Sequence, residues 1–107
     1  MNKIYEDLTI VTVLYDSSEM INDLLKNLKS FKVIVVDNGN NEQILKKLSD
    51  SKNVKVITQK KNLGYGRAIN FAFEKIKSKY FFVLNPDLVI SEKSIYNLYT
   101  LIIKNPG

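Results

Sequence analysis

Apolar runs rich in β-branched and aromatic residues alternate along the chain with segments whose apolar residues recur at helical spacing. The runs predict buried strands in four stretches: residues 8–14, 32–37, 54–58 and 81–84. The other segments predict helices with these apolar faces: Met20, Ile21, Leu24, Leu25 and Leu28; Ile44, Leu45 and Leu48; Ala68, Ile69, Ala72, Phe73 and Ile76; Ile95, Leu98, Tyr99 and Ile102. Alternating strands and helices predict an α/β fold, a Rossmann-like parallel sheet with helices on both faces.

The fourth run has the composition of a central strand of a parallel sheet, and it stops at Asn85 and Pro86. Residues 88–90 predict a short extra strand after this break. Ser91 is placed to cap the last helix. The whole chain, residues 1–107, has a length that suits a single domain with one core.

The charge of the chain limits the classes of partner that it is expected to bind. The net charge is +5, but fifteen of the sixteen basic residues are lysines that are dispersed along the chain. Dispersed lysines are typical of a solvated surface, so no nucleic-acid partner is expected. The same positive field favours a small ligand that carries phosphate.

Cysteine and histidine are both absent. Their absence excludes disulfides, thiolate or histidine zinc sites and a histidine general base. Any metal must then have oxygen ligands, which indicates Mg²⁺ or Mn²⁺. The N-terminal residues lack the apolar core of a signal peptide, and no apolar run has the length of a membrane span. We therefore expect a cytoplasmic protein, with the cytosolic face of a membrane as the alternative location.

Three of the predicted strands end on polar residues. These residues are Tyr15 and Asp16 after the first strand, Asp37 and Asn38 at the second, and Asn85 and Asp87 at the fourth. The carboxyl ends of parallel strands lie at one edge of a sheet, where ligands bind, so these residues should face one crevice. A helix cap is the alternative role for Asp16, and a simple turn is the alternative for Asp37 and Asp87.

Asp87 is the candidate metal ligand. A carboxylate just past a buried strand suits a divalent cation that also binds phosphate oxygens. The segment 60–70 is a candidate phosphate-binding loop, because Gly64 and Gly66 precede a predicted helix whose first N–H groups attract anions. Arg67, the only arginine, is a candidate to reach a diphosphate or a base, with exposed helix surface as the alternative.

Four stretches agree in order and spacing with a known family: TIVTVLYDSSEMI, KVIVVDNGNNE, NLGYGRAIN and FFVLNPDLVI. They resemble the nucleotide-sugar-binding half of family 2 glycosyltransferases with the GT-A fold, across nearly all of the chain. Asp-Asn-Gly at the second strand end and Asn-Pro-Asp at the fourth are most similar to the branch that transfers rhamnose or related sugars. The resemblance implies a metal-dependent, inverting transferase that moves a sugar from a UDP or dTDP donor to a saccharide or lipid-linked acceptor.

The resemblance also implies roles for single residues. Asp37 would hydrogen-bond the base, and Tyr15 with Asp16 would line the pocket for the base and ribose. Asp87 would ligate Mg²⁺ or Mn²⁺ on the donor diphosphate. Asn62 would shape the loop beneath the base together with Gly64. The complete predicted donor site is Tyr15, Asp16, Asp37, Asn38, Asn62, Gly64, Arg67, Asn85 and Asp87.

The sequence departs from the family pattern at the end of the first strand, where Leu14 stands in place of the common Thr or Pro and Asp16 in place of the Asn, and at three further points. Asn85 replaces the first carboxylate of the usual Asp-x-Asp motif. Ile69 occupies the slot of a base-contacting arginine, and whether Arg67, two residues earlier, replaces it is left open. The acceptor-binding half, which carries the catalytic base in the family, has no counterpart here. We therefore expect the N-terminal donor-binding part of a longer enzyme, inactive alone, with exposed apolar surface that favours self-association.

Two other classes of protein remain as alternatives. One is a non-catalytic nucleotide-binding or interaction module. The other is a signalling receiver domain, which is also a small α/β sheet with aspartates at its strand ends. A receiver needs an acidic pair after the first strand and a phosphoacceptor aspartate after the third, whereas this chain has one aspartate and then Thr58 at those places.

Overall fold

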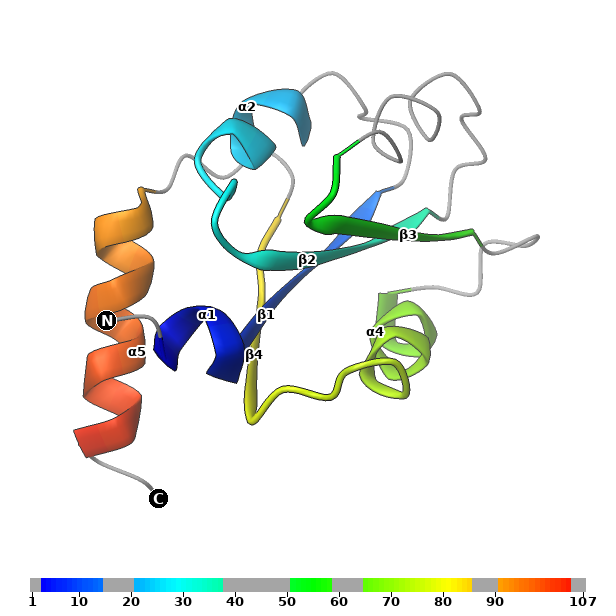
Figure 1. Ribbon diagram of the computed structural model, residues 1–107. Coiled ribbons are helices and arrows are strands. Elements are labelled where there is room, and N and C mark those ends of the chain that lie inside the picture. Colours follow the sequence, from blue (N-terminus) through cyan, green and yellow to red (C-terminus); the bar gives the residue numbers. More distant parts are fainter. Residues whose placement is uncertain (1–2, 15–20, 38–50, 59–64, 86–90, 105–107) are drawn as a thin grey trace.

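The computed structural model describes five stretches of the chain, residues 3–14, 21–37, 51–58, 65–85 and 91–104 (Figure 1). Their elements are α1 (Lys3–Asp7), β1 (Leu8–Leu14), α2 (Ile21–Lys26), β2 (Lys32–Asp37), β3 (Val54–Thr58), α4 (Tyr65–Phe73), β4 (Tyr80–Val83) and α5 (Glu92–Lys104). The predicted strands 8–14, 32–37 and 54–58 are confirmed with the predicted bounds. Three predicted features lie outside the described residues: the helix around Ile44, the strand 88–90 and the cap at Asp16.

The strands form one parallel sheet in the order β3-β2-β1-β4. In the register, Val11 of β1 lies between Ile34 of β2 and Val83 of β4. All seven residues of β1 are buried, and so are the last five of β2. The α/β class and the parallel sheet are therefore as the sequence predicted.

In the described sheet the fourth strand lies at the end of the order, whereas the sequence predicted a central strand. Among the described strands β4 pairs only with β1, and all four of its residues are half-buried. Phe81 and Val83 pack on the side of the sheet that α4 covers, while Tyr80 and Phe82 pack on the other side. An apolar run reports burial above and below the sheet, and it does not report a neighbouring strand on each side.

Two apolar clusters cover the two faces of the sheet. Ile4 of α1, Leu24 of α2 and Ile95 of α5 pack on one face, together with alternate residues of β1 and β2. Ala72 of α4 packs on the opposite face with Val11 and its neighbours. Helices thus lie on both faces, as the alternation of strands and helices predicted (Figure 1).

Half of the predicted inner face of α5 is exposed. The cap is confirmed, because the Ser91 hydroxyl accepts a hydrogen bond from the Ser94 backbone N–H at 3.1 Å. Ile95 and Tyr99 are buried, but Leu98 and Ile102 are 46% and 36% exposed. Helical spacing identifies the apolar stripe, whereas the neighbouring elements decide how much of it is covered. None of the described helices combines the length and the apolar character that crossing a bilayer requires.

The start of α4 corrects the predicted phosphate-binding loop. The helix begins at Tyr65, so Gly66 is a helical residue and does not belong to a loop before the helix. At the other end Phe73 is 58% exposed, although it was assigned to the inner face. It makes an edge contact with Phe81 of β4, with ring centroids 5.5 Å apart.

The N-terminal helix α1 was not predicted, because five residues are too few for a helical repeat to stand out. It nevertheless joins two distant parts of the chain. The Tyr99 hydroxyl of α5 donates a hydrogen bond to Asp7 Oδ2 at 3.0 Å. Burial raises the pKa of Tyr99 above its ordinary value, and the bond to the Asp7 carboxylate raises it further.

Tyr99→Phe is expected to lower the free energy of unfolding by about 1–2 kcal/mol at neutral pH, since it removes this hydrogen bond. The folded state holds the Tyr99 proton more tightly than the unfolded state does. The resulting stability is fully present below the ordinary pKa of about 10 and is lost as pH rises through the higher folded pKa. Urea unfolding between pH 7 and pH 11 should therefore show a smaller alkaline loss in Tyr99→Phe than in the parent. Tyr96→Phe, an exposed tyrosine of the same helix, is the control, and an equal change in both variants would contradict the assignment.

Gly66→Ala is expected to stabilise the fold by about 0.4–1 kcal/mol, because Gly66 has helical backbone in the first turn of α4 and alanine lowers the conformational entropy of the unfolded chain. A Cβ at this exposed position would meet nothing within 4 Å. Thermal unfolding checks the sign, with Asn70→Ala on the same helix as the control. A lower melting temperature for Gly66→Ala alone would show that the glycine itself is required there.

Candidate functional site

The sheet reverses its direction of growth at β1. From β1 the chain passes through α2 to β2 and then to β3 on one side, and from β3 it crosses through α4 to β4 on the other side. The helices α2 and α4 lie on opposite faces, which places β1 and β4 on either side of a topological switch point. Ligands of open parallel sheets bind in the crevice outside the carboxyl ends of the strands at such a point.

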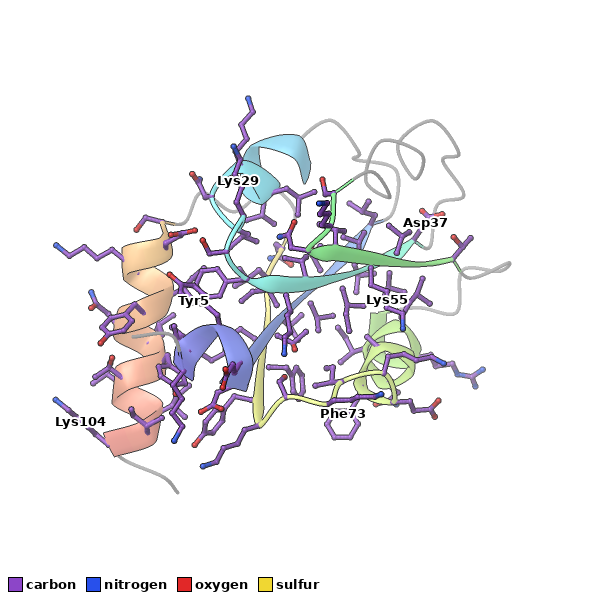
Figure 2. The ribbon with its side chains drawn as sticks, viewed as in Figure 1. Tyr5, Lys29, Asp37, Lys55, Phe73 and Lys104 are labelled. Atoms are coloured by element: carbon purple, nitrogen blue, oxygen red, sulfur yellow. The ribbon has the colours of Figure 1, made fainter. Side chains whose placement is uncertain are left out.

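Asp37 stands at this edge as the last residue of β2 (Figure 2). The register places it between Leu14, the last residue of β1, and Thr58, the last residue of β3. Its side chain is 1% exposed, and no other charged side chain of the described part of the chain is buried. Burying a carboxylate among apolar strands is costly, so its position beside the ligand-binding edge points to a binding role.

Asn85 lies at the same edge on the other side of β1. The Leu84 N–H donates to the Val11 carbonyl at 2.8 Å, which extends the pairing of β4 with β1 by one residue. Asn85 follows directly and is exposed, so its amide is accessible at the carboxyl end of β4. The prediction that Asp37 and Asn85 belong to one edge of the sheet is confirmed.

Thr12 is a polar residue that the sequence did not single out. Its hydroxyl is fully buried two residues before the end of β1 and has no hydrogen-bond partner among the described residues. A threonine inside a β-branched run is typical of any strand, so no sequence signal distinguishes it.

Arg67 and Ile69 lie on opposite sides of α4. Ile69 is half-buried and packs against the cluster that contains Ala72, whereas Arg67 is exposed. Residues two apart on a helix point in directions about 200° apart, because each residue turns by about 100°. Arg67 therefore does not point where a side chain in the Ile69 slot points.

The remaining predicted site residues lie outside the described residues. They are Tyr15, Asp16, Asn38, Asn62, Gly64 and Asp87. Within the part of the chain that is described, no three acidic, histidine or cysteine side chains gather as a possible metal site. The described share of the predicted donor site is thus Asp37, Arg67 and Asn85.

The strand order also bears on the receiver alternative. The order β3-β2-β1-β4 is that of the dinucleotide-binding sheets, whereas receiver domains place their first strand between the second and third. The end of β3, where a receiver carries its phosphoacceptor aspartate, is occupied by Thr58. The fold therefore disagrees with a receiver domain both in topology and at its central residue.

Comparison with solved structures identifies the same architecture in a glycosyltransferase. The mannosyltransferase PcManGT from Pyrobaculum calidifontis, in complex with GDP-Man and Mn²⁺, superimposes with a TM-score of 0.79 at 15% sequence identity. The match covers 94% of this chain and 33% of that chain. The expected GT-A fold is thereby confirmed.

Two curated relatives are similar in sequence. The teichoic acid poly(glycerol phosphate) polymerase of Staphylococcus epidermidis is 31% identical over 97 residues, which cover 81% of this chain and 13% of that protein. The low-salt glycan biosynthesis hexosyltransferase Agl10 of Haloferax volcanii is 30% identical over 101 residues, which cover 90% of this chain and 33% of that protein. The chain therefore spans a third or less of the length of these relatives.

The model of one protein family, described as glycosyl transferase family 2, matches residues 9–107. The match includes all four strands of the sheet and the edge that carries Asp37 and Asn85. This chain belongs to glycosyl transferase family 2.

Proposed function

We propose that this chain is the donor-binding part of a glycosyltransferase and takes a nucleoside-diphosphate sugar at the carboxyl edge of its sheet. The observation that carries the proposal is Asp37, a carboxylate that is 1% exposed at the end of β2 and adjoins the switch point. An ionised carboxylate only accepts hydrogen bonds, so it suits the N–H groups on the edge of a base. The strand register places it between the last residues of β1 and β3.

The similar proteins support a nucleoside-diphosphate sugar as the donor. One is a hexosyltransferase, and the solved mannosyltransferase holds GDP-Man and Mn²⁺. A GDP donor therefore joins UDP and dTDP among the nucleotides to test. Membership of the rhamnose-transferring branch rests on the Asp-Asn-Gly and Asn-Pro-Asp motifs alone and stays a prediction.

A divalent cation, Mg²⁺ or Mn²⁺, is part of the proposal. Asp87 would hold it, two residues after the accessible amide of Asn85 at the carboxyl end of β4. Hard cations of this kind take oxygen ligands and need only one or two carboxylates when phosphates complete the shell. When bound, the cation would neutralise charge on the departing nucleoside diphosphate.

The protein groups have separate tasks in this scheme. Asp37 would orient the base, Tyr15 and Asp16 would border the base and ribose, and Asn85 would position the diphosphate. The sugar would then project toward a saccharide or lipid-linked acceptor. Inversion at the anomeric carbon requires a general base, which we assign to a part of the enzyme beyond this chain.

The length of the chain relative to the curated relatives bears on which part of the enzyme it forms. The chain spans 13% and 33% of its two curated relatives, which supports the hypothesis of an N-terminal donor-binding part that is inactive alone. A cytoplasmic location, with the cytosolic face of a membrane as the alternative, stays a prediction.

Titration calorimetry of the chain with UDP, dTDP and GDP, with and without Mn²⁺, tests the donor site. We expect Mn²⁺-dependent binding of one nucleotide in the micromolar to millimolar range, and about a tenfold or greater loss in Asp37→Asn and in Asp87→Asn. Asp87→Asn should remove the Mn²⁺ dependence, whereas Asp37→Asn should weaken binding of the nucleoside diphosphate with and without metal.

Glu74→Gln is the matched control, because it removes one acidic charge at an exposed position after α4. If the control and both aspartate variants lost the same affinity for the nucleotide, the change in net charge alone would explain the loss. Binding that neither aspartate variant weakens would contradict a donor site at this edge. Arg67→Ala, measured in parallel, decides whether that side chain contributes despite its direction on α4.

We also propose that the chain associates with a second copy of itself through the exposed side of α5. Leu98, Leu101 and Ile102 are 46%, 58% and 36% exposed on this helix, and their spacing places them on one side of it. Adjoining exposed apolar side chains of this kind favour a partner surface. Sedimentation velocity should give a coefficient that rises with concentration. The double variant Leu98→Ser/Ile102→Ser should abolish the rise, while Asn97→Ser should keep it. A monomer at every concentration would contradict the proposal.

A further inference from the structure

A cavity of about 360 Å³ opens at the amino-terminal edge of the sheet, opposite the proposed donor site. Thr9, Val33 and Val54, which lie at or next to the first residues of β1, β2 and β3, line it. The cavity has the size of a small-ligand site. Its most unusual feature is its charge, because five lysines line it: Lys32, Lys52, Lys55, Lys75 and Lys77.

The lysines come from three separate parts of the fold. Lys32 begins β2, and Lys55 lies opposite Ile34 on the face of the sheet that α4 covers. Figure 2 shows Lys55 on the side of β3 that faces α4. Lys75 and Lys77 come from the segment between α4 and β4, and Lys52 precedes β3. The sheet and the α4–β4 connection thus hold the five ammonium-bearing side chains around one space.

No acidic side chain lines the cavity among the described residues. Among these lysines, Lys32 Nζ donates a hydrogen bond to the Glu6 backbone carbonyl at 3.5 Å. Like charges that surround one cavity without carboxylates raise its positive potential, and low-dielectric walls concentrate that potential. The cavity therefore favours an anionic occupant.

The polar uncharged side chains that line the cavity, Thr9, Asn53 and Ser78, already donate hydrogen bonds within the protein. Ser78 Oγ donates to the Tyr80 carbonyl at 2.8 Å, so the 2.6 Å contact of Thr9 Oγ1 with Ser78 Oγ uses the Thr9 proton. Asn53 Nδ2 donates to the carbonyls of Leu28 and Phe31, both at 2.9 Å. Lysine ammonium groups line the same cavity, and they recognise charge more than shape.

The nearby end of α4 does not oppose an anion strongly. The carbonyls of a helix C-terminus carry partial negative charge, which repels anions. Here the backbone N–H groups of Glu74, Lys75 and Ile76 satisfy carbonyls of the last turn of α4 at 2.9–3.3 Å. Lys75 and Lys77 follow directly and offset the remaining partial charge.

We propose that this lysine cavity is a second ligand site, which binds a molecule carrying several adjacent phosphate groups. Several clustered negative charges match several point charges, whereas a single phosphate would engage only part of the cluster. The site is independent of the proposed donor site, because it lies at the opposite edge of the sheet and needs no divalent cation. A soluble polyphosphate compound and a membrane of anionic lipids present the same chemistry.

Titration of the chain with tripolyphosphate and with orthophosphate, in EDTA and at low salt, tests the site. EDTA removes any contribution of a metal-dependent donor site. We expect tripolyphosphate to bind at least about tenfold more tightly than orthophosphate, and its affinity to fall steeply with added salt. The variant Lys55→Gln/Lys77→Gln should lose about tenfold or more in affinity for tripolyphosphate.

The matched control is Lys93→Gln/Lys104→Gln on α5. Both double variants lower the net charge from +5 to +3, and both change exposed lysines, but only the first pair lines the cavity. A parallel flotation assay compares vesicles of phosphatidylglycerol with vesicles of phosphatidylcholine. Circular dichroism of each variant establishes that it is folded.

Tripolyphosphate binding that is weakened only in the cavity variant supports a soluble ligand. Binding only to phosphatidylglycerol vesicles, weakened only in the cavity variant, supports the same site with lipid headgroups as the source. Equal weakening in the two double variants would show general attraction by net charge and overturn the site. Absence of binding to both tripolyphosphate and phosphatidylglycerol vesicles would overturn it as well.

Discussion

The burial of β1 between two parallel neighbours is the constraint on which the rest of the structure depends. Every residue of this strand is buried, so alternate side chains point into apolar clusters above and below the sheet. Two covered faces require helices on both sides, and right-handed crossovers then place α2 and α4 on opposite faces. The reversal of strand order at β1 is a consequence, and with it the position of the crevice at the carboxyl edge.

The two edges of the sheet carry opposite chemistry as a result. The carboxyl edge holds a buried carboxylate at Asp37 and an accessible amide at Asn85. The amino edge gathers the five cavity lysines. Because α4 follows β3 and precedes β4, it runs from the first edge toward the second, and Lys75 and Lys77 follow its C-terminus. The direction of the parallel strands therefore separates the two sites and orients the helix dipole between them.

The strands at the centre of the fold were predictable because their composition has one explanation. Residues 8–14 and 32–37 are apolar, β-branched and bounded by turn residues, and the structure keeps both bounds. Sheet edges were not predictable, since the run that forms β4 is equally compatible with a central position. For a related reason, the sequence did not predict the short helix α1, and it did not predict that the apolar face of α5 is only half covered. Local sequence reports which residues are apolar, whereas tertiary packing decides which of them are covered.

The candidate site likewise has features that the sequence predicts and features that depend on the fold. The rule that ligands bind at the carboxyl ends of parallel strands identified Asp37 and Asn85, because strand ends are visible in sequence. The near-complete burial of Asp37 and the buried hydroxyl of Thr12 were not visible, since both depend on neighbouring strands. The five cavity lysines likewise come from separate segments that only the folded sheet brings together.

The phase of α4 limits how this chain can recognise a base. Ile69 and Ala72 face the sheet, so the slot that carries a base-contacting arginine in the family pattern is used here for packing. A shift of two positions on a helix exchanges the inner side for the outer side, so Arg67 would have to reach a base from the exposed side of α4. Under the proposed function, Asp37 is the described residue that would contact the base, and the strand register fixes its place at the end of β2. Under the proposed function, nucleotide selectivity should therefore depend on which bases present an N–H group to the Asp37 carboxylate.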